Sequence, residues 1–186
     1  MSDQAPEPQV PHVVQSEHPF RGRLVNVRVD TVETATGSGT REVVEHPGAV
    51  LLIALDGEDN VFMVRQYRHP VGRVLLELPA GTIDEGEDAE ACAVRELREE
   101  TGYRPRRIER LCSFFLSPGY STEEIHLFLA SDLEEAPLDT GDEEDLSSAR
   151  IPFAEALRRV ESGEICDAKS MAALLLYARR RERRRA

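Results

Sequence analysis

The stretch of sequence that decides the fold runs from residue 81 to residue 103. It reads Gly81-Thr-Ile-Asp-Glu-Gly-Glu87 and, after seven further residues, Arg95-Glu-Leu-Arg-Glu-Glu-Thr-Gly-Tyr103. Between Asp88 and Thr101 there is no glycine or proline, and apolar residues recur at helical spacing. We therefore predict a helix over 88–101 that follows a glycine-containing loop and is ended by Gly102.

Three glutamates of this helix occupy positions that stability alone does not favour. Glu96, Glu99 and Glu100 have the spacing i, i+3 and i+4, so their carboxylates share one face. Like charges at this spacing repel, and the helix dipole disfavours anions in the last turn. Arg95 and Arg98 are expected to lie off this face. A bound divalent cation would remove the conflict, whereas a solvated acidic face is the simpler interpretation.

The order of these residues resembles the signature of the Nudix hydrolase family. The signature is a glycine, five residues, a glutamate, seven residues and then R-E-U-x-E-E-x-G-U, in which U is apolar. The chain matches it from Gly81 to Tyr103, where a tyrosine takes the place of the usual aliphatic residue. Seven positions demand one residue type, so chance agreement is on the order of 10⁻⁷ per window. The resemblance implies the Nudix fold, a mixed β-sheet sandwiched between helices.

The resemblance also implies a role for each residue of the motif. The family hydrolyses a nucleoside diphosphate linked to another group, and the implied cofactor is Mg²⁺, with Mn²⁺ as a substitute. Glu100 is both a metal-ligand candidate and a catalytic candidate. The metal-ligand positions are matched by Glu96, Glu99, Glu100 and the backbone carbonyl of Ala80. The positions that serve the structure of the motif are matched by Gly81, Glu87, Arg95 and Gly102.

Residues outside the motif resemble the ADP-ribose pyrophosphatase branch of the family. Pro118 lies fifteen residues after Tyr103, within the run Ser117-Pro-Gly-Tyr-Ser-Thr-Glu123 that resembles a loop of this branch. Tyr120 in the same run leaves a dinucleoside polyphosphate hydrolase as an alternative. The substrate-binding residues that the resemblance implies are Arg41, Arg68, Pro118 and Glu123.

A second acidic stretch supplies the candidates for the catalytic acid or base. Asp142-Glu-Glu-Asp145 resembles the loop that carries the catalytic glutamate of the branch, and the alignment there is loose by one residue. Glu143 is the first choice and Glu144 the second. The simpler interpretations are an acidic loop for these two residues, a solvated loop acid for Glu123 and a surface arginine for Arg68.

The composition excludes several classes of protein. The chain has 186 residues and a net charge of −12, which argues against a main role in binding nucleic acid or an anionic membrane. Its three cysteines form no CxxC pair, which argues against a disulfide framework or a zinc ribbon. The first residues lack an apolar signal segment, and no apolar run approaches the ~20 residues of a membrane span. We expect a cytoplasmic protein without a membrane partner.

The chain is expected to contain one α/β or α+β domain with additions at both ends. Residues 1–16 read as a flexible arm, and residues 17–47 read as strands that resemble the dimerisation region of the branch. Residues 48–178 are expected to form the Nudix domain. Residues 179–186 read as an arginine-rich tail, a solvated and frayed helix end.

These observations lead to one expected function and two alternatives. The expected function is Mg²⁺-dependent hydrolysis of the pyrophosphate bond of ADP-ribose to AMP and ribose 5-phosphate, by a homodimer. The first alternative is a pyrophosphatase of the same family for another nucleotide sugar or a dinucleotide. The second is a ligand sensor without catalysis, which the loss of a motif glutamate would favour; no motif glutamate is lost here.

Overall fold

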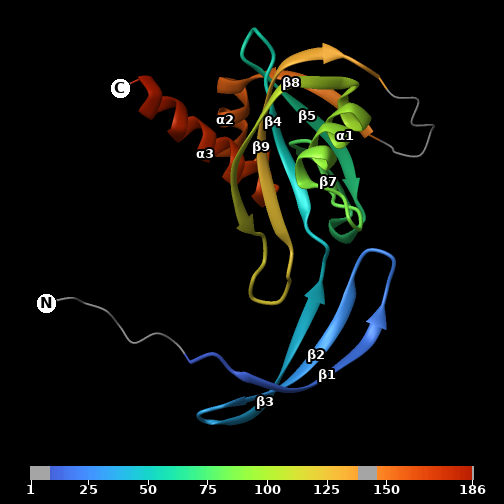
Figure 1. Cartoon of the computed structure of the whole chain (residues 1–186). Coiled ribbons are helices and arrows are strands. Elements are labelled where there is room, and N and C mark those ends of the chain that lie inside the picture. Colours follow the sequence, from blue (N-terminus) through green and yellow to red (C-terminus); the bar gives the residue numbers. More distant parts are fainter. Residues whose placement is uncertain (1–8, 138–145, 186) are drawn as a thin grey trace, which may run out of the picture. The chain divides into compact units, whose positions relative to one another are not determined.

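The chain is seen here as a computed structural model that describes residues 9–137 and 146–185. It divides into two compact units (Figure 1). Unit one comprises Met1–Pro47 with Ser117–Glu123, and unit two comprises Gly48–Leu116 with Glu124–Ala186. Strand β4 follows directly on unit one, and the chain returns to unit one for the segment 117–123.

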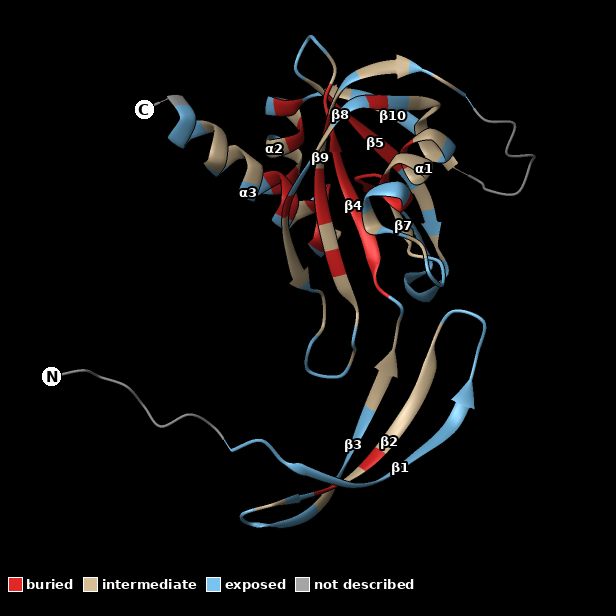
Figure 2. Cartoon of the chain, in the orientation of Figure 1, coloured by how far each residue is buried: buried red, intermediate tan, exposed pale blue. Residues whose placement is uncertain are grey.

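Unit one contains an antiparallel sheet of three strands in the order β1-β2-β3. Every residue of β1 is exposed, and within the described part of this sheet only Asp30 and Val32 are buried (Figure 2). The segment 117–123 pairs with the end of the sheet, because the Val44 amide donates to the Tyr120 carbonyl at 2.7 Å. The strands are β1 (His12–Arg21), β2 (Asn26–Thr34) and β3 (Gly37–Glu45).

The first strand begins earlier than the sequence predicts. Residues 1–16 were expected to be an arm, yet β1 starts at His12 and pairs with β2 from there. The local sequence is polar and gives no strand pattern, so the strand depends on its partner. Ser16 illustrates this, because its hydroxyl donates to the Asp30 carboxylate on β2 at 2.6 Å.

Unit two is built on a mixed sheet in the order β7-β4-β9-β8 and an antiparallel sheet in the order β10-β5-β6. Strands β4 and β9 run parallel, and the other paired strands of these sheets run antiparallel. The strands are β4 (Ala49–Ala54), β5 (Asn60–Arg68), β6 (Arg73–Glu77), β7 (Ala80–Thr82), β8 (Tyr103–Phe115), β9 (Glu124–Glu135) and β10 (Leu146–Pro152). The helices are α1 (Ala89–Thr101), α2 (Phe153–Glu161), α3 (Ala168–Arg185) and the short 3-10 helix η1 (His69–Val71).

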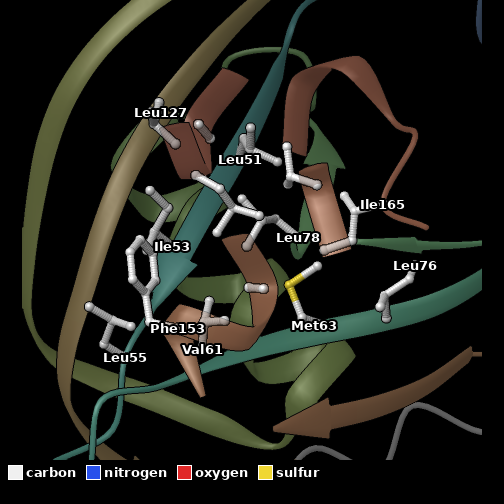
Figure 3. Close-up of a cluster of buried hydrophobic side chains, with 14 of the residues drawn as sticks. Leu51, Ile53, Leu55, Val61, Met63, Leu76, Leu78, Leu127, Phe153 and Ile165 are labelled. Atoms are coloured by element: carbon white, nitrogen blue, oxygen red, sulfur yellow. The ribbon is translucent and has the colours of Figure 1, made fainter. Parts of the chain in front are cut away.

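Strand β4 is buried on both faces, which explains its uninterrupted apolar sequence. Leu51 and Ile53 point into a core cluster that includes residues of α2 and α3, seen in Figure 3. Val50 and Leu52 point the other way, into a cluster with the buried face of α1. Helices therefore cover both faces of the sheet, and the expected architecture of a mixed sheet between helices is confirmed (Figures 1 and 2).

Local capping signals set the ends of two helices. The Asp88 carboxylate accepts from the amides of Glu90 and Ala91, and Gly102 ends α1 with a left-handed φ of 76°. The Asp167 carboxylate accepts from the Ser170 amide at 3.0 Å and so caps α3. A residue with a side chain would be strained at position 102, which accounts for the last glycine of the motif.

Two arginines of the arginine-rich tail contact other elements, whereas Arg183 and Arg184 are exposed. Helix α3 continues to Arg185, and the Arg180 guanidinium donates to the Leu111 carbonyl at 2.7 Å. Arg181 donates to both carboxylate oxygens of Asp59, at 2.7 and 2.9 Å, and lies 5.0 Å from the centre of the Phe153 ring. Composition alone did not show these partners, since they lie far away in the sequence. No helix among the described residues has the length and apolar character to cross a membrane.

Candidate active site

The motif glutamates approach the backbone of β7 closely. The Glu100 carboxylate accepts a hydrogen bond from the Ala80 amide at 3.1 Å. A Cβ atom added to Gly81 would lie 1.8 Å from the carboxyl carbon of Glu96, so only glycine leaves room for that carboxylate. Pairing with β4 holds the strand in place, with Leu51 opposite Ala80. The last two turns of α1 therefore place two carboxylates against the segment Ala80–Gly81.

Arg95 braces this arrangement through its whole guanidinium group. Its Nε and Nη2 atoms donate to the two carboxylate oxygens of Glu87, at 2.9 and 2.8 Å. Its Nη1 atom donates to Glu96 at 2.6 Å and to Glu99 at 2.9 Å. The expectation that Arg95 lies off the glutamate face is wrong, because the long side chain curves back and Glu99 is one turn away. The positive charge of Arg95 thus offsets part of the predicted repulsion between the glutamate carboxylates.

These contacts change the ionisation of their partners. The hydrogen bonds from Arg95 hold the pKa of Glu87 at about 2, and the same contact raises the pKa of Arg95. Burial, with a smaller contribution from Glu87, raises the pKa of the Cys92 thiol to about 12. Cys92 is therefore a buried neutral thiol at neutral pH and does not act as a nucleophile.

The donor atoms near Ala80 fit a hard divalent cation. Glu96, Glu99 and Glu100 offer carboxylate oxygens, and Ala80 offers a backbone carbonyl on the strand that two of them touch. Oxygen donors of this kind are the ligands that Mg²⁺ prefers. Within the described ranges no three acidic, histidine or cysteine groups already stand as a formed metal site. The glutamates would therefore have to turn from Arg95 and from the Ala80 amide to bind a cation.

Arg68 is held by a buried carboxylate. Its Nε and Nη2 atoms donate to Glu77 at 2.8 and 2.7 Å, and the hydrogen bonds to Glu77 raise the pKa of Arg68. The Arg68 side chain remains 37% exposed. The partner of Arg68 in the structure is thus Glu77. The contact of Arg68 with the substrate stays a prediction.

Three of the other predicted site residues belong to unit one, whereas the motif belongs to unit two. Arg41, Pro118 and Glu123 belong to unit one, where Arg41 is exposed on β3 and the Glu123 amide donates to the Ser121 hydroxyl at 3.2 Å. None of these three residues belongs to unit two, which contains the motif glutamates. Glu143 and Glu144 lie outside the described residues.

Comparison with known proteins places this arrangement in a family. The family model described as "NUDIX domain" matches residues 45–174. The chain belongs to the Nudix family.

Individual members of the Nudix family resemble the chain over most of its length. It is 37% identical to the "ADP-ribose pyrophosphatase" of Bacillus subtilis (strain 168), over 87% of this chain and 89% of that protein. It is 42% identical to the "ADP-ribose pyrophosphatase" of Mycobacterium tuberculosis (strain ATCC 25618 / H37Rv), over 87% of this chain and 80% of that protein. A crystal structure of an "ADP compounds hydrolase" superposes with a TM-score of 0.83 at 25% identity, covering 94% of this chain and 96% of that one.

Sequence reasoning missed one group of residues next to the Nudix motif. Glu77, three residues before Ala80, is almost fully buried and contacts Lys169 as well as Arg68. Two signals in the sequence could have found it: a glutamate directly after an apolar run, and the single lysine of an arginine-rich chain.

One described cleft lies beside the end of the Nudix motif, since Tyr103 is among the residues that line it. It has a volume of about 750 Å³ and contains none of the predicted site residues. Within it, the Arg150 guanidinium lies 5.6 Å from the centre of the Phe62 ring and 5.7 Å from that of Tyr103. Because none of the motif glutamates lines it, we assign no part of the Nudix reaction to this cleft.

The Glu87–Arg95 contact predicts a pH-dependent contribution to stability. The pKa of Glu87 is lowered from 4.5 to about 2, so its contribution is complete above pH 4.5 and is lost as the pH falls from there towards 2. Glu87→Gln should lower the free energy of unfolding at pH 7 by about 1.5–3 kcal/mol, the value of a charge-assisted hydrogen bond. The measurement is urea unfolding of both proteins at several pH values.

The difference between the two proteins should shrink steadily below pH 4.5. Glu85→Gln is the matched control, since Glu85 is exposed and two residues away. A gap that stays constant down to pH 2 would show that the carboxylate charge of Glu87 contributes nothing.

Proposed function

We propose that the chain hydrolyses the pyrophosphate bond of ADP-ribose to AMP and ribose 5-phosphate with the help of Mg²⁺. The observation that carries this proposal is the position of the Glu96 and Glu100 carboxylates against the segment Ala80–Gly81. The two relatives named ADP-ribose pyrophosphatases support ADP-ribose as the substrate.

The proposal divides the work between a metal ion and the residues of the chain. When bound, Mg²⁺, or Mn²⁺ in its place, supplies positive charge to the pyrophosphate oxygens and lowers the pKa of water. Glu96, Glu99, Glu100 and the Ala80 carbonyl would hold it, and the Glu87–Arg95 pair keeps loop and helix together. A diphosphate is negatively charged, and the carboxylates of the site would repel it. The positive charge of the bound cation compensates the charge of the diphosphate.

Further residues take roles that rest on the resemblance to the branch. Arg68 would bind a phosphate oxygen with the edge that Glu77 does not occupy. Glu143, or Glu144 in its place, would accept the proton of the attacking water. Arg41, Pro118 and Glu123 remain candidates for binding the substrate.

The site of action in this proposal is the cytoplasm. The three cysteines, Cys92, Cys112 and Cys166, are all free, and thiols stay reduced in that compartment. The net charge of −12 is consistent with a small-molecule substrate rather than nucleic acid.

The decisive experiment is hydrolysis of a substrate panel with Mg²⁺ in ¹⁸O-labelled water. ADP-ribose should be turned over faster than ADP-glucose, GDP-mannose and NAD⁺, and the labelled product reports which phosphorus is attacked. Equal rates on ADP-ribose and ADP-glucose would reject a specific ADP-ribose pyrophosphatase in favour of a broader nucleotide-sugar enzyme. No turnover of any compound would favour the sensor.

The metal-ligand assignment predicts the effect of two substitutions. Glu99→Gln and Glu100→Gln should each lower kcat at saturating Mg²⁺ by at least about 100-fold, since a metal that positions water and phosphate supplies several kcal/mol. Glu90→Gln is the control, because Glu90 is exposed in the first turn of the same helix. Near-normal turnover in both Glu99→Gln and Glu100→Gln would remove these residues from the metal site.

The catalytic acid or base predicts a different kinetic signature. Glu143→Gln should lower kcat by about 10²–10⁴-fold, the range of general acid–base catalysis, and leave KM nearly unchanged. Glu144→Gln should have a small effect. The reverse result, measured in the same steady-state assay, would move the role to Glu144.

We also propose that unit one makes the protein a homodimer. Val13, Val14 and Phe20 on β1 are each about half exposed, at 49%, 48% and 55%. Exposed apolar side chains on a strand at the edge of a sheet favour an interaction surface there.

Light scattering should give twice the chain mass of 20.8 kDa. The double variant Val13→Asp with Phe20→Asp should give a monomer, because charge on the covered strand opposes association. Val74→Asp, at an exposed position of β6 in unit two, should remain a dimer. A monomeric mass for the unmodified chain would contradict the proposal.

A further inference from the structure

A group of charged and polar side chains lies behind the segment that leads into the Nudix motif. Glu77 ends β6 with only 1% of its surface exposed. From the first turn of α3, Lys169 contacts Glu77 and Ser170 contacts the amide of the next residue, Leu78; the two are 9% and 0% exposed. We call the following residues the Glu77 cluster: Arg68, Glu77, Asp167, Lys169 and Ser170.

The charges of the cluster compensate one another. Lys169 Nζ contacts Glu77 and lies 2.9 Å from the Asp167 carboxylate, while Arg68 donates twice to Glu77. Burial raises the pKa of Glu77, but the hydrogen bonds from Arg68 and the charge of Lys169 outweigh it, so that the pKa is lowered. Glu77 is therefore ionised, and it needs both cations because a buried charge with too few partners is costly.

The cluster also holds the backbone of the next residue. The Ser170 hydroxyl donates to Asp167 at 2.6 Å and accepts from the Leu78 amide at 2.8 Å. Its proton is thus directed to a carboxylate, which leaves a lone pair aimed at the amide.

The backbone between this contact and the motif is held at each step. The Pro79 carbonyl accepts from the Leu52 amide at 2.9 Å, and the Ala80 amide donates to Glu100 at 3.1 Å. One serine hydroxyl from α3 therefore holds the chain two residues before the Ala80 carbonyl.

Arg68 keeps one edge for another partner. Glu77 takes its Nε and Nη2 atoms, and within the described part of the chain its Nη1 atom has no hydrogen-bond partner. The hydrogen bonds to Glu77, with a smaller contribution from the charge of Glu100, raise the pKa of Arg68, so the guanidinium stays charged.

We propose that the first turn of α3, through Lys169 and Ser170, positions the Ala80 carbonyl and Arg68 for the reaction. Ser170 acts on the carbonyl through Leu78, and Lys169 acts on Arg68 through Glu77. Both are positioning residues, since neither touches the substrate. The inference rests on the proposed function, because it requires the motif to hold a divalent cation and a diphosphate.

Direct metal binding tests the first half of the inference. Ser170→Ala should weaken Mn²⁺ binding by the full chain roughly five- to thirty-fold, as expected for one lost buried hydrogen bond. The readout is electron paramagnetic resonance of free Mn²⁺ without substrate, and the Mg²⁺ half-saturation of activity should shift equally. Ser162→Ala, which removes an exposed hydroxyl at the end of α2, should change neither value.

The kinetic constants test the second half. Lys169→Met should raise KM for ADP-ribose roughly tenfold with a smaller change in kcat, because Glu77 then holds Arg68 without a second cation. Arg179→Met is the control, since Arg179 is exposed on the same helix and pairs only with Glu182 among the described residues. A purely structural role would lower the unfolding temperature and the active fraction while KM and metal affinity stay unchanged.

The outcomes separate the inference from the proposed function. Normal Mn²⁺ affinity in folded Ser170→Ala together with normal KM in folded Lys169→Met would overturn the inference while the unmodified chain remains active. An unmodified chain that neither binds Mn²⁺ nor hydrolyses the panel would overturn the proposed function instead. If Ser170→Ala does not fold, Ser170→Cys keeps the size and removes the strong acceptor, and the same shift in metal affinity decides.

Discussion

The close approach of helix α1 to strand β7 is the constraint on which the site depends. The carboxyl group of Glu96 occupies the space where a side chain of residue 81 would be, so this position of the carboxylate requires a glycine at residue 81. Everything else in the motif serves that contact: capping fixes the length of α1, and Arg95 ties its glutamates to the preceding loop. The site is therefore a property of two elements held together, rather than of an acidic helix alone.

Local signals made part of this predictable from the sequence. Helix α1 has its cap at Asp88, its end at Gly102 and an apolar stripe between them, and each of these acts over a few residues. The sequence of strand β4 is apolar throughout, which is a local sign of a strand buried on both faces. The family resemblance then supplied what periodicity could not, the chemical meaning of the glutamates.

Non-local partners explain what the sequence could not predict. Strand β10 is half polar and exists because it pairs along β5. Lys169 and Glu77 are 92 positions apart, and neither carries a local sign of the other. Arg95 was misplaced for a different reason, since helix geometry gives the direction of a Cβ atom but not the path of a long flexible side chain. The division into two units also separates predicted site residues that the sequence alone treats as one set.

The burial of Lys169 has a consequence for how this protein can be handled and modified. It is the only lysine of the chain, and its amine lies between two carboxylates with 9% of the residue exposed. Acetylation and ubiquitination of lysine, and lysine-directed labelling, require an accessible ε-amino group. The folded domain offers no such group, so we expect neither lysine modification nor lysine-directed labelling as long as the first turn of α3 stays in place.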